Sequence, residues 1–283
     1  MKAYEKILIS YFIILSFIIV VFTKPFTHNY IYLLLNALFI ILIIVVSRIQ
    51  TNHPHALTTF IRHWLPILLF TFLYKETKPL LHLITHGWYD EFFATLDARI
   101  FGVNLGLWVE KFDLPILNEI FRLGYVSYYF IIVIGSALHY FYGKIENFEK
   151  MIAQVTMTFC ISYLMFIFFP TQGPRFFHAH LFNSNMDGLL ISAFQMKIME
   201  VVAFPGGAFP SSHIAVVIIV WFSLYSSNRK FFNIFAPFVI LLILGTIWGR
   251  YHYAVDAIAG IILALLVYLI YPILNKRLFY DKL

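Results

Sequence analysis

Eight long apolar runs constrain this chain more than any other feature of its sequence. A helix that crosses a bilayer needs about 20 mostly apolar residues, with a range of about 17–25. Because hydrocarbon offers the backbone no hydrogen-bond partners, such runs predict transmembrane helices. The expected helices cover residues 7–23, 30–47, 57–74, 116–141, 151–169, 212–226, 232–249 and 256–273.

Composition supports a membrane protein and argues against a soluble one. Of the 283 residues, 61% are hydrophobic and 12% are charged, whereas soluble domains average about 45–50% and about 25%. The predicted fold class is therefore all-α, a polytopic membrane helix bundle of about eight transmembrane helices. The net charge of +6 comes from residues scattered through short loops, which favours contact with membrane lipids and no nucleic-acid partner.

An even number of spans places both ends of the chain on one side of the membrane. The short loops expected on that side are rich in lysine and arginine, as cytoplasmic loops are. This side is therefore predicted to be cytoplasmic, and the other side non-cytoplasmic. The positive residues concerned are Arg48, Lys144, Lys150, Arg229, Lys230, Lys276, Arg277 and Lys282.

Three short polar fragments lie at the edges of the apolar runs, all on the predicted non-cytoplasmic face. They are residues 170–175 (PTQGPR), 210–213 (PSSH) and 250–256 (RYHYAVD). Together they supply two histidines, a carboxylate, two arginines and an anion-binding turn. Such a set suits phosphoryl transfer through a histidine at a membrane surface.

The last fragment contains the candidate nucleophile. His252 and Asp256 are four residues apart, which places both on one face of a helix. A carboxylate beside an imidazole selects its tautomer and stabilises its protonated form, and the free ring nitrogen can attack phosphorus. The competing interpretation is a pair that only satisfies two polar groups between helices.

The other fragments contain candidate phosphate-binding groups and a candidate acid. Ser211 suits a helix N-cap and Ser212 adds a second hydroxyl, while free N–H groups at a helix start bind anions. His213 is placed to protonate a leaving oxygen, and Arg175 and Arg250 suit bidentate phosphate binding. Each residue alone is also typical of a cap or of lipid contact. Their joint occurrence favours an enzyme.

In order and spacing, the fragments resemble the type 2 phosphatidic acid phosphatase superfamily, which also includes the vanadium haloperoxidases. The resemblance covers roughly residues 90–272. It implies a six-helix catalytic core, a phosphohistidine on His252 with Asp256 as its partner, and His213 as the general acid. It also implies phosphate contacts from Ser211 and Arg175, and chemistry that uses no metal or other cofactor.

The chain departs from the family pattern at three positions. Phe168 stands where the first motif has a lysine, Ser212 where the second has a glycine, and Thr246 where the third has an arginine. The form of residues 250–256, together with 170–175, looks more like the branch that holds inositol phosphorylceramide and sphingomyelin synthases. We therefore expect that a different set of side chains binds the phosphate, and that this set includes both Arg175 and Arg250.

The predicted function is transfer of the phosphoryl group of a lipid phosphate to water or to an alcohol acceptor. The competing function is a non-catalytic lipid or ion transporter whose polar residues line a pathway, although the sequence has no internal repeat of the kind that many transporters show. Residues 1–56 are expected to form two N-terminal transmembrane helices, and residues 57–283 the catalytic membrane domain.

Two further sets of residues receive structural interpretations. The connection over residues 75–115 repeats apolar residues at helical spacing, which predicts an amphipathic helix at the membrane interface. Asp90 and Asp97 are interpreted as caps of that helix. His178 and His180 have a metal-like spacing, but no carboxylate or cysteine set completes a site, so no metal is predicted.

Overall fold

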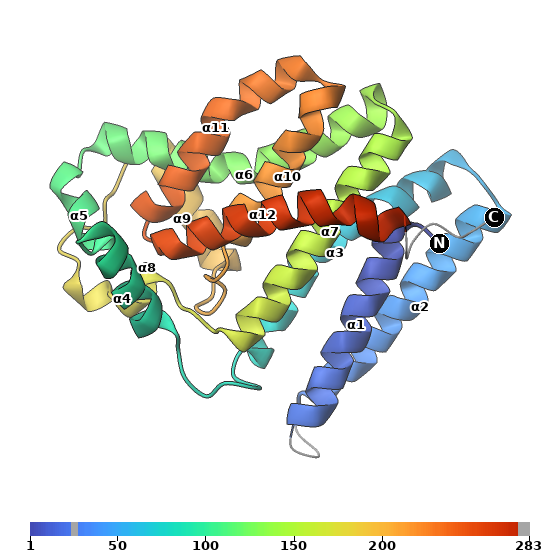
Figure 1. Cartoon of the computed structure of the whole chain (residues 1–283), viewed down its shortest axis with the longest axis horizontal. Helices are drawn as coiled ribbons and strands as arrows, with labels where there is room; N and C mark the ends of the chain where they lie inside the picture. The colour runs from blue at the N-terminus through green and yellow to red at the C-terminus, as the bar shows by residue number, and fades with distance from the viewer. Residues whose placement is uncertain (24–27, 277–283) are drawn as a thin grey trace.

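The computed structural model describes residues 1–23 and 28–276 (Figure 1). Over these residues it has twelve α-helices, three short 3-10 helices and no β-strand, so the predicted all-α class is confirmed. Arg277 and Lys282, two of the positive residues used for the topology, lie outside the described residues. The helices are α1 (Ala3–Phe22), α2 (Tyr30–Asn52), α3 (Ala56–Thr77), η1 (Lys78–Leu80), α4 (Asp90–Phe101), α5 (Leu105–Trp108), η2 (Val109–Phe112), α6 (Pro115–Tyr142), α7 (Ile145–Phe168), α8 (Pro174–Phe177), η3 (Ala179–Leu181), α9 (Leu190–Val202), α10 (Ser212–Ser227), α11 (Arg229–Trp248) and α12 (Ala254–Leu274).

Within the described ranges, seven helices are long and apolar enough to cross a membrane: α1, α2, α3 continued by η1, α6, α7, α11 and α12. They match seven of the eight predicted spans. The eighth is α10, which has 16 residues and is shorter than the usual range of about 17–25. It packs against α6, α7, α11 and α12, and residues 214–220 are buried. Protein neighbours therefore surround the first half of α10.

The helix α7 lies at the centre of the bundle, because it packs against α1, α3, α6, α10 and α12. Its side chains Phe148, Met151 and Phe166 are fully buried. Tyr4 and Leu8 of α1 belong to the same apolar cluster as these residues. The first helix is thus packed into one body with the helices that carry the polar fragments.

An ionic network with a buried Arg62–Glu5 pair and a partly exposed Lys2–Glu149 pair joins four helices at the end of the bundle where the chain begins. Arg62 of α3 pairs with Glu5 of α1 over 2.6 Å and donates to the Ser47 hydroxyl of α2 over 2.8 Å. Lys2 reaches Glu149 of α7 over 2.7 Å. Because a buried charge is costly when it loses its partner, these contacts hold α1 and α2 against α3 and α7.

The predicted amphipathic helix is present as α4. Its Phe93 is buried, whereas Phe92 and Ile100 are exposed, so one apolar side faces away from the protein. The helix packs against α5, α8 and α12. Figure 1 shows α4, α5 and α8 together at the end of the bundle remote from the N-terminus. The three polar fragments lie at this end.

Candidate active site

Backbone hydrogen bonds bring the three polar fragments together. The Arg175 amide donates to the Arg250 carbonyl over 2.8 Å, which joins the first fragment to the third. The Ser211 amide donates to the Asp256 carbonyl over 3.0 Å, which joins the second to the third. Segments that are distant in the sequence therefore form one site, as the topology predicted.

The first fragment approaches the third so closely that it requires a glycine. Gly173 has φ of +88°, a conformation that L side chains rarely adopt. A Cβ atom there would lie 2.5 Å from the Tyr251 carbonyl oxygen. The glycine lets the turn lie against residues 250–251, and Arg175 follows directly at the start of α8.

Two carboxylates of α4 hold the site segments in place. Asp90 accepts hydrogen bonds from the Gln172 and Gly173 amides over 2.8 and 2.9 Å. Asp97 accepts from the amides of Ala254 and Val255, at the start of α12, over 2.8 and 2.9 Å. We expected both carboxylates to cap their own helix. Instead they cap other segments, because their positions two turns apart face the site from one side of α4.

His252 is oriented by a backbone carbonyl. Its Nδ1 lies 2.8 Å from the Ala208 oxygen and 3.6 Å from Oδ2 of Asp256. That carboxylate oxygen accepts instead from the Tyr253 amide over 2.9 Å. The expected hydrogen bond between His252 and Asp256 is thus replaced, since His252 precedes α12 and Asp256 caps its first turn.

The protonation of His252 follows from this environment. Nδ1 faces a carbonyl oxygen, which only accepts, so this nitrogen carries the proton. Burial lowers the pKa of the imidazole to about 4, because an apolar surrounding disfavours the charged form. At neutral pH the ring is therefore neutral, and Nε2 keeps a free lone pair.

His213 lies in the first turn of α10, beside His252. The centroids of the two rings are 5.7 Å apart. Nε2 of His213 is 3.3 Å from the hydroxyl of Tyr125, and Nδ1 has no partner among the described residues. The structure therefore brings the two predicted catalytic histidines together and adds a tyrosine that the motifs did not indicate.

The two serines take different places. Ser211 is fully buried against Gly260 of α12, where a Cβ atom would lie 2.6 Å from the Ser211 carbonyl oxygen. Ser211 occupies the predicted N-cap position of α10, but its hydroxyl makes no cap hydrogen bond and has no partner among the described residues. Ser212 lines a cavity on the far side of His213. Neither hydroxyl borders the space between the histidines.

A small cavity separates the candidate catalytic groups, and we call it the phosphate cavity. It has a volume of about 40 Å³ and is lined by His213, His252, Arg175, Gln172 and Tyr251 among others. This is the space of about three or four water-sized groups, comparable to the oxygens of a phosphoryl group. Arg175 donates to the Tyr251 hydroxyl over 3.2 Å, which places its guanidinium at the wall of this cavity.

Arg250 does not line the phosphate cavity, contrary to our expectation. Its Nε donates to the Gly106 carbonyl over 3.0 Å, its Nη1 to the Ser184 carbonyl over 2.7 Å, and its Nη2 to Glu110 over 2.8 Å. The guanidinium also lies 3.8 Å from the ring centroid of Phe182. A partly buried carboxylate and two carbonyls therefore direct this side chain away from the histidines.

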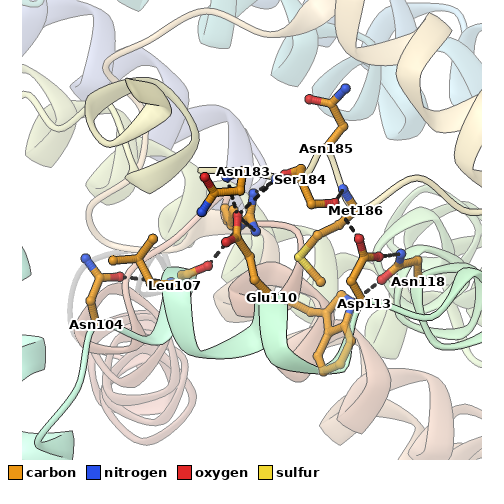
Figure 2. A network of polar contacts seen from close by, with 12 residues as sticks. Asn104, Leu107, Glu110, Asp113, Asn118, Asn183, Ser184, Asn185 and Met186 are labelled. Atoms are coloured by element: carbon orange, nitrogen blue, oxygen red, sulfur yellow. Dashed lines mark hydrogen bonds and ion pairs between the residues drawn. The ribbon is translucent and has the colours of Figure 1, made fainter. Parts of the chain in front are cut away.

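The network around Arg250 extends along the outer connections. Figure 2 shows Glu110, Asp113 and Ser184 in it. Asp113 accepts hydrogen bonds from the Ser184 hydroxyl and, over 2.6 Å, from Asn118, while Asn118 accepts from Trp248 at the end of α11 over 2.8 Å. The network links η2, the 183–187 segment, α6 and α11 behind the turn that carries His252.

The remaining departures from the family pattern add no cation to the cavity. Thr246 is buried, and its carbonyl accepts from the amides of Tyr251 and His252 over 3.0 and 3.2 Å. Phe168 ends α7 and is 40% exposed. Sequence reasoning missed Gln172, although it lies inside the first motif. The side chain of His178, which we considered as a metal ligand, contacts Asn104 over 3.4 Å.

Comparison with known proteins identifies the family. The sequence profile of the PAP2 superfamily matches residues 91–270, which include all three polar fragments. The chain belongs to the PAP2 superfamily. This agrees with the resemblance inferred from the motifs, and membership in this superfamily suggests phosphatase or phosphotransferase chemistry.

A more distant relative points the same way. The chain is 26% identical over 165 residues to a PA-phosphatase related-family protein of Dictyostelium discoideum. The match covers 51% of this chain and 30% of that protein, so the chain spans about a third of the length of this relative. No solved structure matches.

Proposed function

We propose that this PAP2 protein transfers the phosphoryl group of a lipid phosphate through His252. The observation that carries the proposal is the pairing of two histidines across the phosphate cavity, one of them neutral with its proton held on Nδ1. A neutral imidazole with a free Nε2 is a competent nucleophile toward phosphorus. Arg175 supplies positive charge beside it, where the transition state gathers negative charge.

The reaction proceeds in two steps. Nε2 of His252 attacks phosphorus, the bond from phosphorus to the lipid oxygen breaks, and His213, which enters this step as the imidazolium, donates its proton to the departing alkoxide. Water then attacks the phosphohistidine, the bond from nitrogen to phosphorus breaks, and His213 takes the proton of the attacking water. Inorganic phosphate and the lipid alcohol leave, and both histidines return to their starting states.

An alcohol can replace water in the second step. With a phosphate monoester as donor, the product is then the phosphorylated acceptor alcohol. The absent first-motif lysine and the form of residues 250–256 favour such transfer, as in the synthase branch that the motifs resemble. The distribution of lysine and arginine among the short loops supports a reaction on the non-cytoplasmic face.

Replacement of His252 by Ala tests the assignment in the purified, reconstituted protein. Release of phosphate from decyl phosphate should be lost, while the variant still inserts and elutes as the wild type does. Radiolabelled substrate quenched in alkali should leave phosphate on the wild-type protein and none on the variant. Full activity of His252→Ala would refute the mechanism.

The acceptor is tested separately. Turnover is measured with inositol or glycerol present, and phosphorylated polyol is quantified beside free phosphate. Phosphorylated polyol formed at the expense of free phosphate supports transfer. If free phosphate is the product at every acceptor concentration, the enzyme is a phosphatase.

A further inference from the structure

A second cavity, larger than the phosphate cavity, lies on the other side of His213. It has a volume of about 240 Å³ and is enclosed by residues of α3, α6, α7, α9 and the start of α10. Tyr74, Tyr125, Met199, Ala203 and His213 line both cavities. We call it the chain cavity. The proposed acid therefore borders both spaces, so a ligand can occupy the two at once.

The chain cavity lies where α3 and α6 diverge. At the end of these helices remote from the site, the ring of Trp64 lies 5.8 Å from that of Tyr140 and 6.4 Å from that of Phe141. Nearer the site, Thr71 of α3 and Val133 of α6 line the cavity. Residues of α7 line it as well, and α7 packs against both helices. At that remote end, α3 and α6 are thus in contact through aromatic rings.

The opening of the chain cavity lies between the exposed sides of α3 and α6. Thr71 and Val133 both line it and are exposed, Val133 to 51%. Both belong to helices long and apolar enough to cross a membrane. Leu68 and Phe130, about one turn away, are exposed apolar side chains. An apolar mouth between two such helices opens toward lipid and not toward water.

The lining of the chain cavity suits hydrocarbon. Apart from His213, its wall contains no titratable side chain except tyrosines, among the described residues. The hydroxyl of Tyr163 donates to the Phe70 carbonyl over 3.0 Å, and that of Tyr125 contacts His213. These two tyrosines thus present ring surface to a ligand. A charged headgroup finds no partner there, whereas an apolar chain does.

We propose that the chain cavity binds one hydrocarbon chain of the substrate, which enters between α3 and α6 while its phosphate occupies the phosphate cavity. The inference rests on the proposed function and adds the substrate class. The cavity is smaller than the roughly 300–1,000 Å³ of pockets that enclose drug-sized ligands. It therefore takes one chain, and the substrate is a single-chain alkyl or prenyl phosphate.

A tryptophan at the mouth tests the assignment. Val133→Trp fills the entrance, and Ile134→Trp is the matched control, because Ile134 is exposed on the same helix but does not line the cavity. The readout is the ratio of kcat/KM for decyl phosphate to that for butyl phosphate. Val133→Trp should lower this ratio about tenfold through loss of chain contacts, and the control should preserve it.

The outcomes separate this inference from the proposed function. If Val133→Trp leaves the ratio of the two kcat/KM values unchanged, the inference fails but the proposed function does not. The same holds if the wild type turns over dipalmitoyl phosphatidate and decyl phosphate equally well. If the wild type releases phosphate from no ester, the proposed function fails. Thr71→Trp repeats the test on α3 should the first variant not fold. Its control is Ile61→Trp, because Ile61 is exposed on the same helix but does not line the cavity.

Photolabelling places the chain without reliance on turnover. A decyl phosphate analogue with a diazirine at the end of its chain is bound to the full-length protein, irradiated and mapped by mass spectrometry. Labels within the segments that line the chain cavity, residues 67–74, 125–133, 159–163 and 199–203, support the proposal. Labels confined to other parts of the chain contradict it, whether or not the ester is a substrate. A farnesyl phosphate competitor distinguishes prenyl from alkyl chains by which one prevents labelling at lower concentration.

Discussion

The hydroxyl of Tyr125 lies 3.3 Å from Nε2 of His213, and the centroids of the two rings are 5.3 Å apart. Tyr125 also packs against Tyr251, at 4.4 Å between centroids, and Tyr251 contacts Arg175. A continuous row of side chains therefore runs from the proposed acid to the arginine of the phosphate cavity. Tyr125 comes from α6, which carries none of the three motifs.

Replacement of Tyr125 by Phe should slow the proton-transfer step. The substitution keeps the ring but removes the hydroxyl that orients His213, so kcat should fall about tenfold with little change in KM. The pH profile of kcat should shift, which loss of packing alone would not cause. Tyr142→Phe, an exposed change on the same helix outside both cavities, is the control. Equal profiles for both variants and the wild type would remove Tyr125 from the mechanism.

Arg250 and Glu110 should act as a unit that positions the turn before His252. Arg250→Gln should lower kcat but leave KM nearly unchanged, because its guanidinium lies outside the phosphate cavity. Together with Glu110→Gln it should show a coupling energy of about 0.5–3 kcal/mol in a double-mutant cycle on unfolding. Arg175→Gln should lower kcat and also raise KM, because its guanidinium lies at the phosphate cavity, and it should show no coupling to Glu110. Matching kinetic effects of the two arginine variants would contradict these roles.

Removal of the Asp97 carboxylate should loosen the start of α12. Asp97→Ala deprives two amides of their acceptor, which should cost about 1–3 kcal/mol of unfolding free energy and reduce kcat through displacement of His252. Glu91→Gln, an exposed change on the same helix, is the control. Denaturant unfolding and initial rates are measured on both. The placement of Asp97 is wrong if the two variants are equally stable.

Acid should destabilise the protein through His252. Its folded-state pKa of about 4 is below the unfolded value of about 6.5, so the unfolded chain takes up this proton first as pH falls. The stability from the neutral ring is complete above pH of about 6.5 and is lost between about 6.5 and 4. The Tm of the wild type should therefore fall relative to that of His252→Gln over this range. Parallel Tm curves would disprove the low pKa.

Most of the transmembrane helices can be predicted from the sequence, because a helix in contact with lipid requires a long run of apolar residues. The positions of the spans follow from run length, although α7 begins at Ile145 and α2 ends at Asn52, five or six residues beyond the predicted limits. The convergence of the three fragments follows from span parity. Arg250 was misplaced because its partner, Glu110, is 140 residues away in a connection without a motif. The partner of His252 was missed because a carbonyl such as that of Ala208 leaves no trace in side-chain patterns.

For the two carboxylates of α4, the sequence predicts which helix face they share but not which groups they bind. The seven-residue spacing of Asp90 and Asp97 places both on one helix face, which the sequence shows. Which amides they bind depends on how α4 lies across the bundle, and no local pattern encodes that. A rule that an acidic pair on an interfacial helix seeks distant backbone donors would have found both contacts.

The hydrogen bond from His252 to the Ala208 carbonyl also bears on how the site tolerates mutation. Any residue at position 208 that preserves the local backbone presents the same oxygen, so the tautomer of His252 is insensitive to the identity of that side chain. A library of single substitutions would therefore assign position 208 no role beyond its size. Replacement of the main-chain amide after Ala208 by an ester weakens the carbonyl as a hydrogen-bond acceptor. This change would test how far the tautomer of His252 depends on that carbonyl, which side-chain substitutions cannot do.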